Sequence, residues 1–315
     1  MLNIDESYFD GEERDGYYVE PMMKRAWAAE MEILEDIRIV CERHNIRYFA
    51  DWGTLLGTIR HGGFIPWDDD IDISMFRADM YKFAEVARKE LPPNYVVRDF
   101  YSTPDMNDLI VRVNNADSID WHPEFLEKYH DFPFTAGVDI FPLDYVCRDK
   151  DEMEMVRTLT IVIENTMRLI FNPAGTDEQV EEALTALENM TGKVFNRSGD
   201  LIRQLLLLTD QLHAMYTAED ADEVAIITYA SRIPGRTQQP ISAFADVEWR
   251  DFEGLIKVPV PLAWDEILKS EYGNYMEKKI YLPHGNFPFY KSQRRDLKTH
   301  MDAHPECRPY VERFL

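Results

Sequence analysis

Apolar residues recur at the spacing of an α-helix over residues 21–44, which begin with a proline and are followed by Asn45. This pattern predicts an amphipathic helix, because proline suits the first helical turn and asparagine suits the residue after the last turn. Shorter helical patterns follow at residues 53–60 and 78–91. Alternating or β-prone segments predict strands at residues 47–51, 70–75, 95–100, 109–114 and 137–141.

The pattern becomes mainly helical after residue 149, with helical periodicity over residues 150–171, 176–190 and 198–217. The apolar run from Leu205 to Leu208 is most simply part of a helical core. Further on, we expect a strand within residues 224–230 and a helix over residues 264–272.

These patterns predict an α+β fold with three regions. Residues 1–20 are acidic and are expected to be a flexible leader, whereas residues 21–149 should form a mixed sheet flanked by helices. Residues 150–315 are expected to be mainly helical. The segments near the C-terminus are aromatic and proline-rich. A C-terminal part that folds back on the core is compatible with this composition.

The charge of the chain argues against a nucleic-acid partner. Its 315 residues include 58 acidic and 34 basic side chains, a formal net charge of −24, and phosphate would repel such a surface. Three cysteines far apart in the sequence suit a reducing compartment, so we expect a cytoplasmic protein. We expect no signal peptide, because residues 1–20 are acidic and polar, and no membrane span, because no uncharged apolar run approaches about 20 residues. Peripheral association with the inner face of a membrane stays open.

The most informative segment is residues 53–72, with the sequence GTLLGTIRHGGFIPWDDDID. Gly53 and Thr54 follow a predicted strand and open a predicted helix. The free backbone N–H groups and the positive dipole at a helix start form a seat for phosphate. Glycine allows the ligand to approach the backbone closely. The pattern therefore predicts a phosphate-binding turn.

The same segment contains four acids, Asp68, Asp69, Asp70 and Asp72. On a strand, Asp70 and Asp72 would point to one face while Ile71 points to the other. Such close carboxylates repel one another unless a cation neutralises them, and oxygen ligands suit Mg²⁺ or Mn²⁺. We therefore predict a magnesium site, with manganese as a second choice. A solvated, calcium-like or capping loop is the alternative interpretation.

Asp139 lies within residues 137–141, GVDIF, which otherwise form an apolar strand. A carboxylate in such surroundings needs a partner. We interpret Asp139 as a third metal ligand, or as the base that takes a proton from an attacking hydroxyl. A place on an exposed sheet edge is the alternative.

The run over residues 53–72 resembles the signature of the LicD family, which includes the fukutin-like proteins. Two later segments, VDIFPLD at residues 138–144 and YGNYM at residues 272–276, resemble further blocks of the family in the same order. The resemblance is strong over residues 48–76 and 137–144 and weaker over the helical middle.

This resemblance implies a polymerase β-like nucleotidyltransferase core, in which Gly53 and Thr54 hold phosphate and Asp70, Asp72 and Asp139 bind divalent metal. It further implies transfer of a phospho-alcohol, usually phosphocholine from CDP-choline or a related CDP-alcohol. The expected acceptor is a hydroxyl of a glycan or lipid-linked glycan, as in teichoic acid, lipopolysaccharide or capsule. The residues themselves favour metal-assisted displacement at phosphorus but do not choose the alcohol.

Five further residues are candidate substrate contacts. Arg60 and His61 lie one helix beyond the glycine turn and would brace the phosphates, although an Arg60 that only pairs with the acids is the alternative. Trp67 stands beside the acids, and an aromatic face suits a quaternary ammonium. Asp69 is included as a member of the acidic run, and Tyr272 by family resemblance alone.

Three other functions stay open at this point. A D-x-D glycosyltransferase would bind a nucleotide-sugar through the same carboxylates, a nucleotidyltransferase would direct attack at the α-phosphorus, and a catalytically silent binding protein would do neither. The spacing of His300, His304 and Cys307 would reach a zinc ion, but a closed structural site needs a fourth ligand and none is evident.

Overall fold

The computed structural model describes residues 1–172, 175–227, 238–280 and 287–312. The chain divides into two compact units. Unit 1 comprises residues 1–98, 110–141 and 244–315, and unit 2 comprises residues 99–109 and 142–243. Helices and strands are mixed throughout, so the α+β expectation is confirmed.

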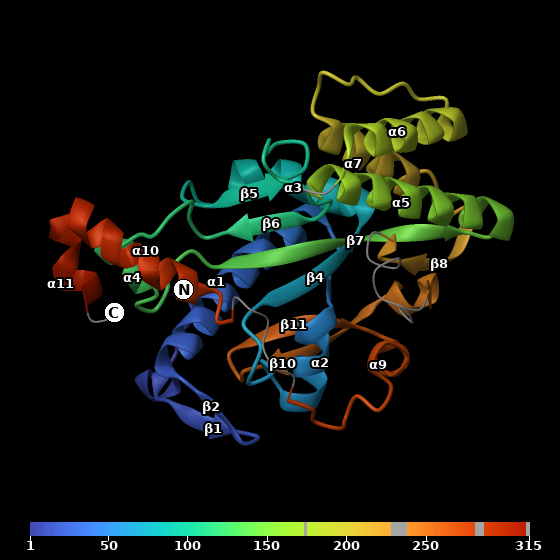
Figure 1. The fold of residues 1–315 in the computed structure, drawn as a ribbon. Helices are drawn as coiled ribbons and strands as arrows, with labels where there is room; N and C mark the ends of the chain where they lie inside the picture. Colours follow the sequence, from blue (N-terminus) through green and yellow to red (C-terminus); the bar gives the residue numbers. More distant parts are fainter. Residues whose placement is uncertain (173–174, 228–237, 281–286, 313–315) are drawn as a thin grey trace. The chain divides into compact units, whose positions relative to one another are not determined.

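The main β-sheet contains strands in the order β3-β4-β7-β6-β5. Figure 1 shows β4, β7 and β6 as neighbouring arrows of this sheet. Strand β3 pairs antiparallel with β4, and β6 pairs antiparallel with the first part of β7. The strands span Phe49–Ala50 (β3), Ile71–Phe76 (β4), Val96–Asp99 (β5), Val111–Asn114 (β6) and Gly137–Cys147 (β7).

The sheet forms because its strands bury apolar residues that the sequence alternates with polar ones. Ile71 and Ile73 on β4, and Val138 and Ile140 on β7, are completely buried. Each predicted strand is present, but β3 is shorter than expected and β7 continues six residues beyond Phe141. That extension belongs to unit 2, where it pairs with β8 (Ala221–Ala225).

Helix α1 (Pro21–His44) is the longest helix of unit 1, and its predicted bounds are confirmed. Proline occupies the first turn, and Asn45 adopts the left-handed conformation that ends the helix. Trp27, on the apolar face of α1, is fully buried. The other helices of unit 1 are α2 (Trp52–His61), α3 (Arg77–Glu90), α4 (Pro123–Lys128), α9 (Trp264–Tyr272), α10 (Tyr290–Ala303) and α11 (Arg308–Val311).

The first twenty residues contain defined elements where the sequence suggested a flexible leader. A 3₁₀ turn, η1 (Glu6–Phe9), precedes a hairpin of β1 (Glu12–Arg14) and β2 (Tyr17–Val19). Arg14 forms an ion pair with Glu253, at the turn between β10 (Val247–Phe252) and β11 (Ile256–Pro261). The two residues are 239 positions apart, so local sequence pattern could not have shown this contact.

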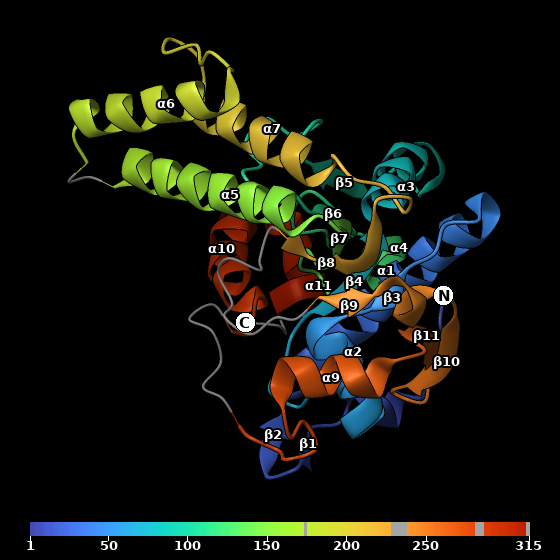
Figure 2. The ribbon, with the colours of Figure 1, turned by 90° about the vertical axis from the view of Figure 1, so that its right-hand side faces the viewer.

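Unit 2 is built around three helices that match the predicted helical segments: α5 (Lys150–Phe171), α6 (Asp177–Thr191) and α7 (Leu201–His213). Figure 2 shows them packed side by side. Strand β8 ends at Ala225, and residues 228–230 of the strand expected there lie outside the described residues. Strand β9 (Gln239–Pro240) pairs with β8. Within the described residues, two further 3₁₀ turns are η2 (Ile241–Phe244) and η3 (Pro305–Cys307).

The apolar runs of these helices form an internal core, as the sequence suggested. Leu205 and Leu208 pack with Ile163 and Leu187, and all four are buried. None of the helices in the described ranges is both long and apolar enough to cross a membrane.

We expect Ile163→Ala to destabilise the protein by about 2–5 kcal/mol, because it removes buried methyl groups and leaves a cavity. Ile163 is 0% exposed, whereas Ile161 on the same helix is 44% exposed. The matched control Ile161→Ala should therefore change stability by less than about 0.5 kcal/mol. Urea unfolding followed by circular dichroism measures both variants, and equal shifts in their midpoints would contradict the packing described here.

Candidate active site

The turn that opens α2 joins the glycine motif to the first acidic strand. Asp51 caps the helix, since its carboxylate accepts the Trp52 N–H at 2.8 Å. Its own N–H donates to the Asp72 carbonyl at 3.1 Å. The Thr54 hydroxyl, buried beneath, accepts the Asp72 N–H at 2.8 Å. Thr54, predicted as a phosphate ligand, thus uses its side chain to hold the strand that carries Asp72.

The carboxylate of Asp68 lies directly over the Cα of Gly53, so a Cβ at this position would displace that carboxylate. The backbone of Asp68 is itself held from α1, since the Trp27 indole N–H donates to the Asp68 carbonyl at 3.0 Å. The glycine motif and the acidic run are therefore packed against each other.

Carboxylate oxygens of Asp68, Asp69 and Asp70 lie within 4.8 Å of one another. Burial raises the pKa of Asp68 well above its usual range, and the neighbouring charges of Asp70 and Asp69 raise it further. One oxygen of Asp69 accepts the backbone N–H of Phe289 at 2.5 Å. Such a set of oxygens is the donor chemistry that a hard divalent cation requires.

Asp72 is the half-buried member of the D-x-D pair, whereas Asp70 is exposed. Burial raises its pKa well above the usual range, and the charges of Asp70, Asp139, Asp68 and Asp51 add to the effect in that order. The charges of Asp70 and Asp139, the other two predicted metal ligands, therefore both act on Asp72. The tight oxygen cluster, however, is formed by residues 68–70, so the predicted ligand set of Asp70, Asp72 and Asp139 stays a prediction.

Asp139 is not alone on its strand. It lies opposite Arg112 of β6 in the sheet register, and the two side chains form a two-point ion pair with N···O distances of 2.5 Å. Side-chain exposure is 23% for Asp139 and 47% for Arg112, so the pair is reachable from solvent. The carboxylate thus has the partner that an acid in an apolar strand needs.

Sequence reasoning missed Glu30, which lies on α1 one turn beyond Trp27. Its side chain is buried, and its Oε2 has no hydrogen-bond partner. Burial raises its pKa well above the usual range, and the charges of Asp70, Asp69, Asp68 and Asp72 raise it further. In the sequence it is one more acid of an amphipathic helix, so no local signal distinguishes it.

A cavity of about 660 Å³ opens beside the acids. Its wall includes Gly53, Arg60, Trp67, Asp69 and Tyr272, all predicted as substrate contacts from positions far apart in the sequence. Further lining residues are Asp68, Tyr275, Lys279 and Phe287. The cavity therefore combines aromatic rings and two cationic side chains with the acidic cluster.

Two of the predicted contacts have partners within the protein. The Arg60 guanidinium donates to the Tyr275 carbonyl at 2.9 Å, which ties α2 to the segment that follows α9. His61 has a side chain only 5% exposed, and its Nε2 lies 3.3 Å from a carboxylate oxygen of Asp15. Burial, reinforced by the nearby charge of Arg60, lowers the pKa of His61 to about 4. This histidine is therefore neutral near pH 7 and does not supply a positive charge to phosphate.

Comparison of the sequence with known proteins relates the segment that carries the site to a protein family. Residues 45–155 match the family model described as LicD/FKTN/FKRP, nucleotidyltransferase domain. The chain is 27% identical over 252 residues to the lipopolysaccharide cholinephosphotransferase LicD of Haemophilus influenzae, covering 78% of this chain and 88% of that protein. Residues 45–155 thus form a LicD-type domain. The resemblance inferred from the sequence is thereby confirmed.

Other relatives match this chain over short segments. Human ribitol 5-phosphate transferase FKRP is 44% identical over 41 residues, which is 13% of this chain and 8% of FKRP. An uncharacterised protein of Rickettsia typhi is 38% identical over 55 residues, or 18% of each chain.

The matched LicD domain includes the glycine turn, the acidic run and Asp139, but only some of the residues that support them. Glu253 is an example. Its carboxylate accepts two bonds from Arg14 at 2.7 and 2.8 Å and the Phe64 N–H at 3.0 Å. A Cβ at Gly63 would collide with this carboxylate, and the Glu253 N–H donates to the Gly62 carbonyl at 2.8 Å. Glu253 thus holds the Gly62–Gly63 loop of the LicD motif in place.

The zinc alternative finds no support in the described residues. The rings of His300 and His304 stack with centroids 4.6 Å apart, and Cys307 is buried. Among the residues that the structure describes, these three do not gather their ligand atoms as Asp68, Asp69 and Asp70 do.

We expect Glu253→Ala to destabilise the protein by about 3–5 kcal/mol, because Arg14 and the Phe64 N–H would lose a buried partner. Glu253 has a side chain only 3% exposed. Glu248→Ala is the matched control on the same hairpin, since Glu248 is 46% exposed and pairs with an exposed Arg250. That control should cost less than about 1 kcal/mol. Thermal unfolding compares them, and a Glu253→Ala protein as stable as the control would refute the role given to this residue.

The raised pKa values of Glu30, Asp68 and Asp72 predict a pH dependence. The folded protein holds protons that the unfolded chain releases near pH 4, so stability without metal should fall as pH rises above about 4. Melting temperatures in EDTA should show this decline, and Glu30→Gln should reduce it. Glu85→Gln, at an exposed acid whose pKa Lys89 lowers, should leave the slope above pH 5 unchanged. A slope that Glu30→Gln does not alter would contradict the burial of a repelled carboxyl at this position.

Proposed function

We propose that this protein is a metal-dependent phosphotransferase that moves a phospho-alcohol, phosphocholine from CDP-choline in the first instance, onto a hydroxyl of a cell-surface glycan precursor. Teichoic acid, lipopolysaccharide and capsule are the candidate acceptors. The observation that carries the proposal is a cluster of carboxylates packed on the glycine turn of a LicD domain, beside a cavity with aromatic and cationic walls. The relatives named as cholinephosphotransferase and ribitol 5-phosphate transferase support the reaction class.

A divalent cation fits the donor set. Carboxylate oxygens of Asp68, Asp69 and Asp70 gather within 4.8 Å, the charge of Asp70 also acts on Asp72, and hard oxygen ligands are those that Mg²⁺ or Mn²⁺ prefers. In our proposal Asp70 and Asp72 hold the ion together with Asp139. Held by these residues, such an ion would supply Lewis-acid chemistry at the phosphates of the donor.

The cavity wall suits the two ends of such a donor. The faces of Trp67 and Tyr272 would hold a quaternary ammonium, which aromatic rings bind well. Arg60 and Lys279 line the same cavity and would face the phosphates. Gly53, which has no side chain, allows the donor to come close to the start of α2.

Asp139 is the proposed base for the acceptor hydroxyl. The hydroxyl oxygen would attack the phosphorus that bears the alcohol, its proton would pass to a carboxylate oxygen of Asp139, and the P–O bond to CMP would break. Arg112, bonded to both oxygens of Asp139, orients this carboxylate. We also propose that the sheet and its helices form a polymerase β-like nucleotidyltransferase core.

The two other transfer reactions would leave different products. A D-x-D glycosyltransferase would release UDP or GDP from a nucleotide-sugar, and a nucleotidyltransferase would leave a nucleotide attached to the acceptor. Incubation with CDP-choline, other CDP-alcohols and nucleotide-sugars distinguishes them. Release of CMP from a CDP-alcohol supports our proposal, whereas release of a nucleoside diphosphate from a sugar donor overturns it.

We expect Asp72→Asn to abolish CMP release while the melting temperature stays the same or rises, because the variant removes a repelled buried charge. EDTA should abolish release by the wild type, and Mg²⁺ should restore it. The control is Asp117→Asn, at a loop acid that is 77% exposed and pairs with Arg98. Chromatography of the nucleotides measures the reaction, and an active Asp72→Asn protein would remove this residue from the mechanism.

A further inference from the structure

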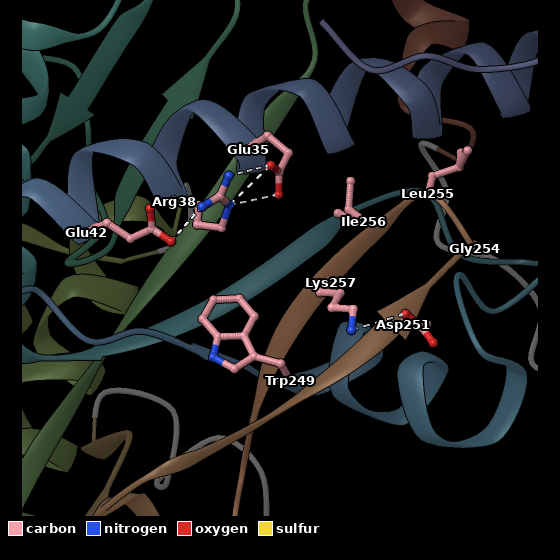
Figure 3. Close-up of a pocket in the computed structure, with 9 residues that line it drawn as sticks. All are labelled: Glu35, Arg38, Glu42, Trp249, Asp251, Gly254, Leu255, Ile256 and Lys257. Atoms are coloured by element: carbon pink, nitrogen blue, oxygen red, sulfur yellow. Dashed lines mark hydrogen bonds and ion pairs between the residues drawn. The ribbon is translucent and has the colours of Figure 1, made fainter.

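A second cavity of unit 1 lies between α1 and the β10–β11 hairpin and has a volume of about 430 Å³. Figure 3 shows three side chains that reach it from α1, those of Glu35, Arg38 and Glu42. Trp249, Asp251 and Lys257 reach it from the hairpin. None of these residues lines the cavity beside the acidic cluster, so the two cavities are formed by different residues. We call this second cavity the groove.

Trp249 supplies an open aromatic face in the groove. Its side chain is 43% exposed, which is unusual for the largest apolar residue. Tyr48 contacts it edge to face, with ring centroids 6.4 Å apart and an interplanar angle of 83°. The Tyr48 hydroxyl behind it is buried and has no hydrogen-bond partner. Tyr48 packs against one part of the indole, and the exposed part of the ring is open to a flat ligand.

The polar side chains of the groove are fixed by one another. The Arg38 guanidinium bonds to Glu35 at 2.9 Å and to Glu42 at 2.5 Å, and Lys257 lies 4.0 Å from Asp251. Three acids are thus matched by two bases, and each acid has a cationic partner. The groove therefore offers hydrogen-bond donors and acceptors with little net charge, and those of Arg38, Glu35 and Glu42 are held by hydrogen bonds.

We propose that this groove binds a saccharide. The apolar C–H face of a pyranose ring stacks on an indole, whose face is electron-rich, and its hydroxyl groups both donate and accept hydrogen bonds. Carboxylates and a guanidinium already held in place satisfy such hydroxyls without ordering new side chains. A quaternary ammonium would have to compete for acids that Arg38 and Lys257 already neutralise, and a phosphate would meet three carboxylates.

The saccharide would belong to the acceptor, and only this part of the inference rests on the proposed function. Glu30 reaches the acidic cluster and Arg38 the groove from the same helix, eight residues apart, which corresponds to about 12 Å along the axis. The groove would then hold a part of the acceptor other than the sugar unit whose hydroxyl is modified.

The test is direct binding to the full chain. The probes are methyl glycosides of glucose, galactose and N-acetylglucosamine with their disaccharides, and the competitors are choline chloride and CMP. Saturation-transfer NMR and tryptophan fluorescence report binding. We expect Trp249→Ala to weaken saccharide binding at least tenfold, Trp249→Phe to weaken it less, and Tyr310→Ala, at an aromatic residue 42% exposed elsewhere on unit 1, to leave it unchanged.

Three results would overturn the inference: no probe saccharide binds, Trp249→Ala binds saccharides as the wild type does, or choline or CMP displaces the saccharide from the groove. The outcome is separable from that of the proposed function. A wild type that binds saccharides through Trp249 but releases no CMP from any CDP-alcohol removes the function and keeps the site. Conversely, transfer to a saccharide acceptor with the same KM in Trp249→Ala and wild type removes the site and keeps the function.

Discussion

Repulsion between carboxylates that are packed together at the start of α2 is the constraint on which the rest of unit 1 depends. Two like charges 4.8 Å apart repel by about 3.5 kcal/mol at an effective dielectric constant near 20. Burial adds a desolvation cost, which is why the pKa values of Asp68, Asp72 and Glu30 are raised. A stable fold can keep such a cluster only if other contacts hold each acid in place, and a cation that neutralises it would bind strongly.

Those other contacts come from several separate elements of unit 1. Trp27 holds the backbone of Asp68 from α1, Thr54 holds that of Asp72 from α2, and the N–H of Phe289 meets Asp69. Glu253 fixes the glycine loop that separates α2 from the acids. The LicD motif thus forms one wall of the site. Thr54 within the motif, and Trp27 and Phe289 outside it, hold the acids in place despite their mutual repulsion.

Helix α1 is common to both sites of unit 1. Glu30, near its middle, faces the acids, whereas Arg38, Glu35 and Glu42 contribute to the groove. The two sites differ in their charges: repelled acids suit a cation with its phosphate donor, and balanced ion pairs suit a neutral, hydroxylated ligand. A transferase acting on a glycan needs both kinds of recognition, and a rigid helix fixes their separation.

The sequence by itself determined the elements and the family. The bounds of α1, the three helices of unit 2 and the D-x-D strand follow from residues within a few positions of one another, because helical and strand periodicity, caps and turns are local. Only the tertiary structure decided that Glu253 meets Arg14, that Asp139 pairs with Arg112, and that Tyr272 joins Trp67 in one cavity wall. These partners lie tens to hundreds of residues apart. Their contact depends on how sheet and helices pack, and no local pattern of charge or polarity specifies which distant residue a side chain will meet.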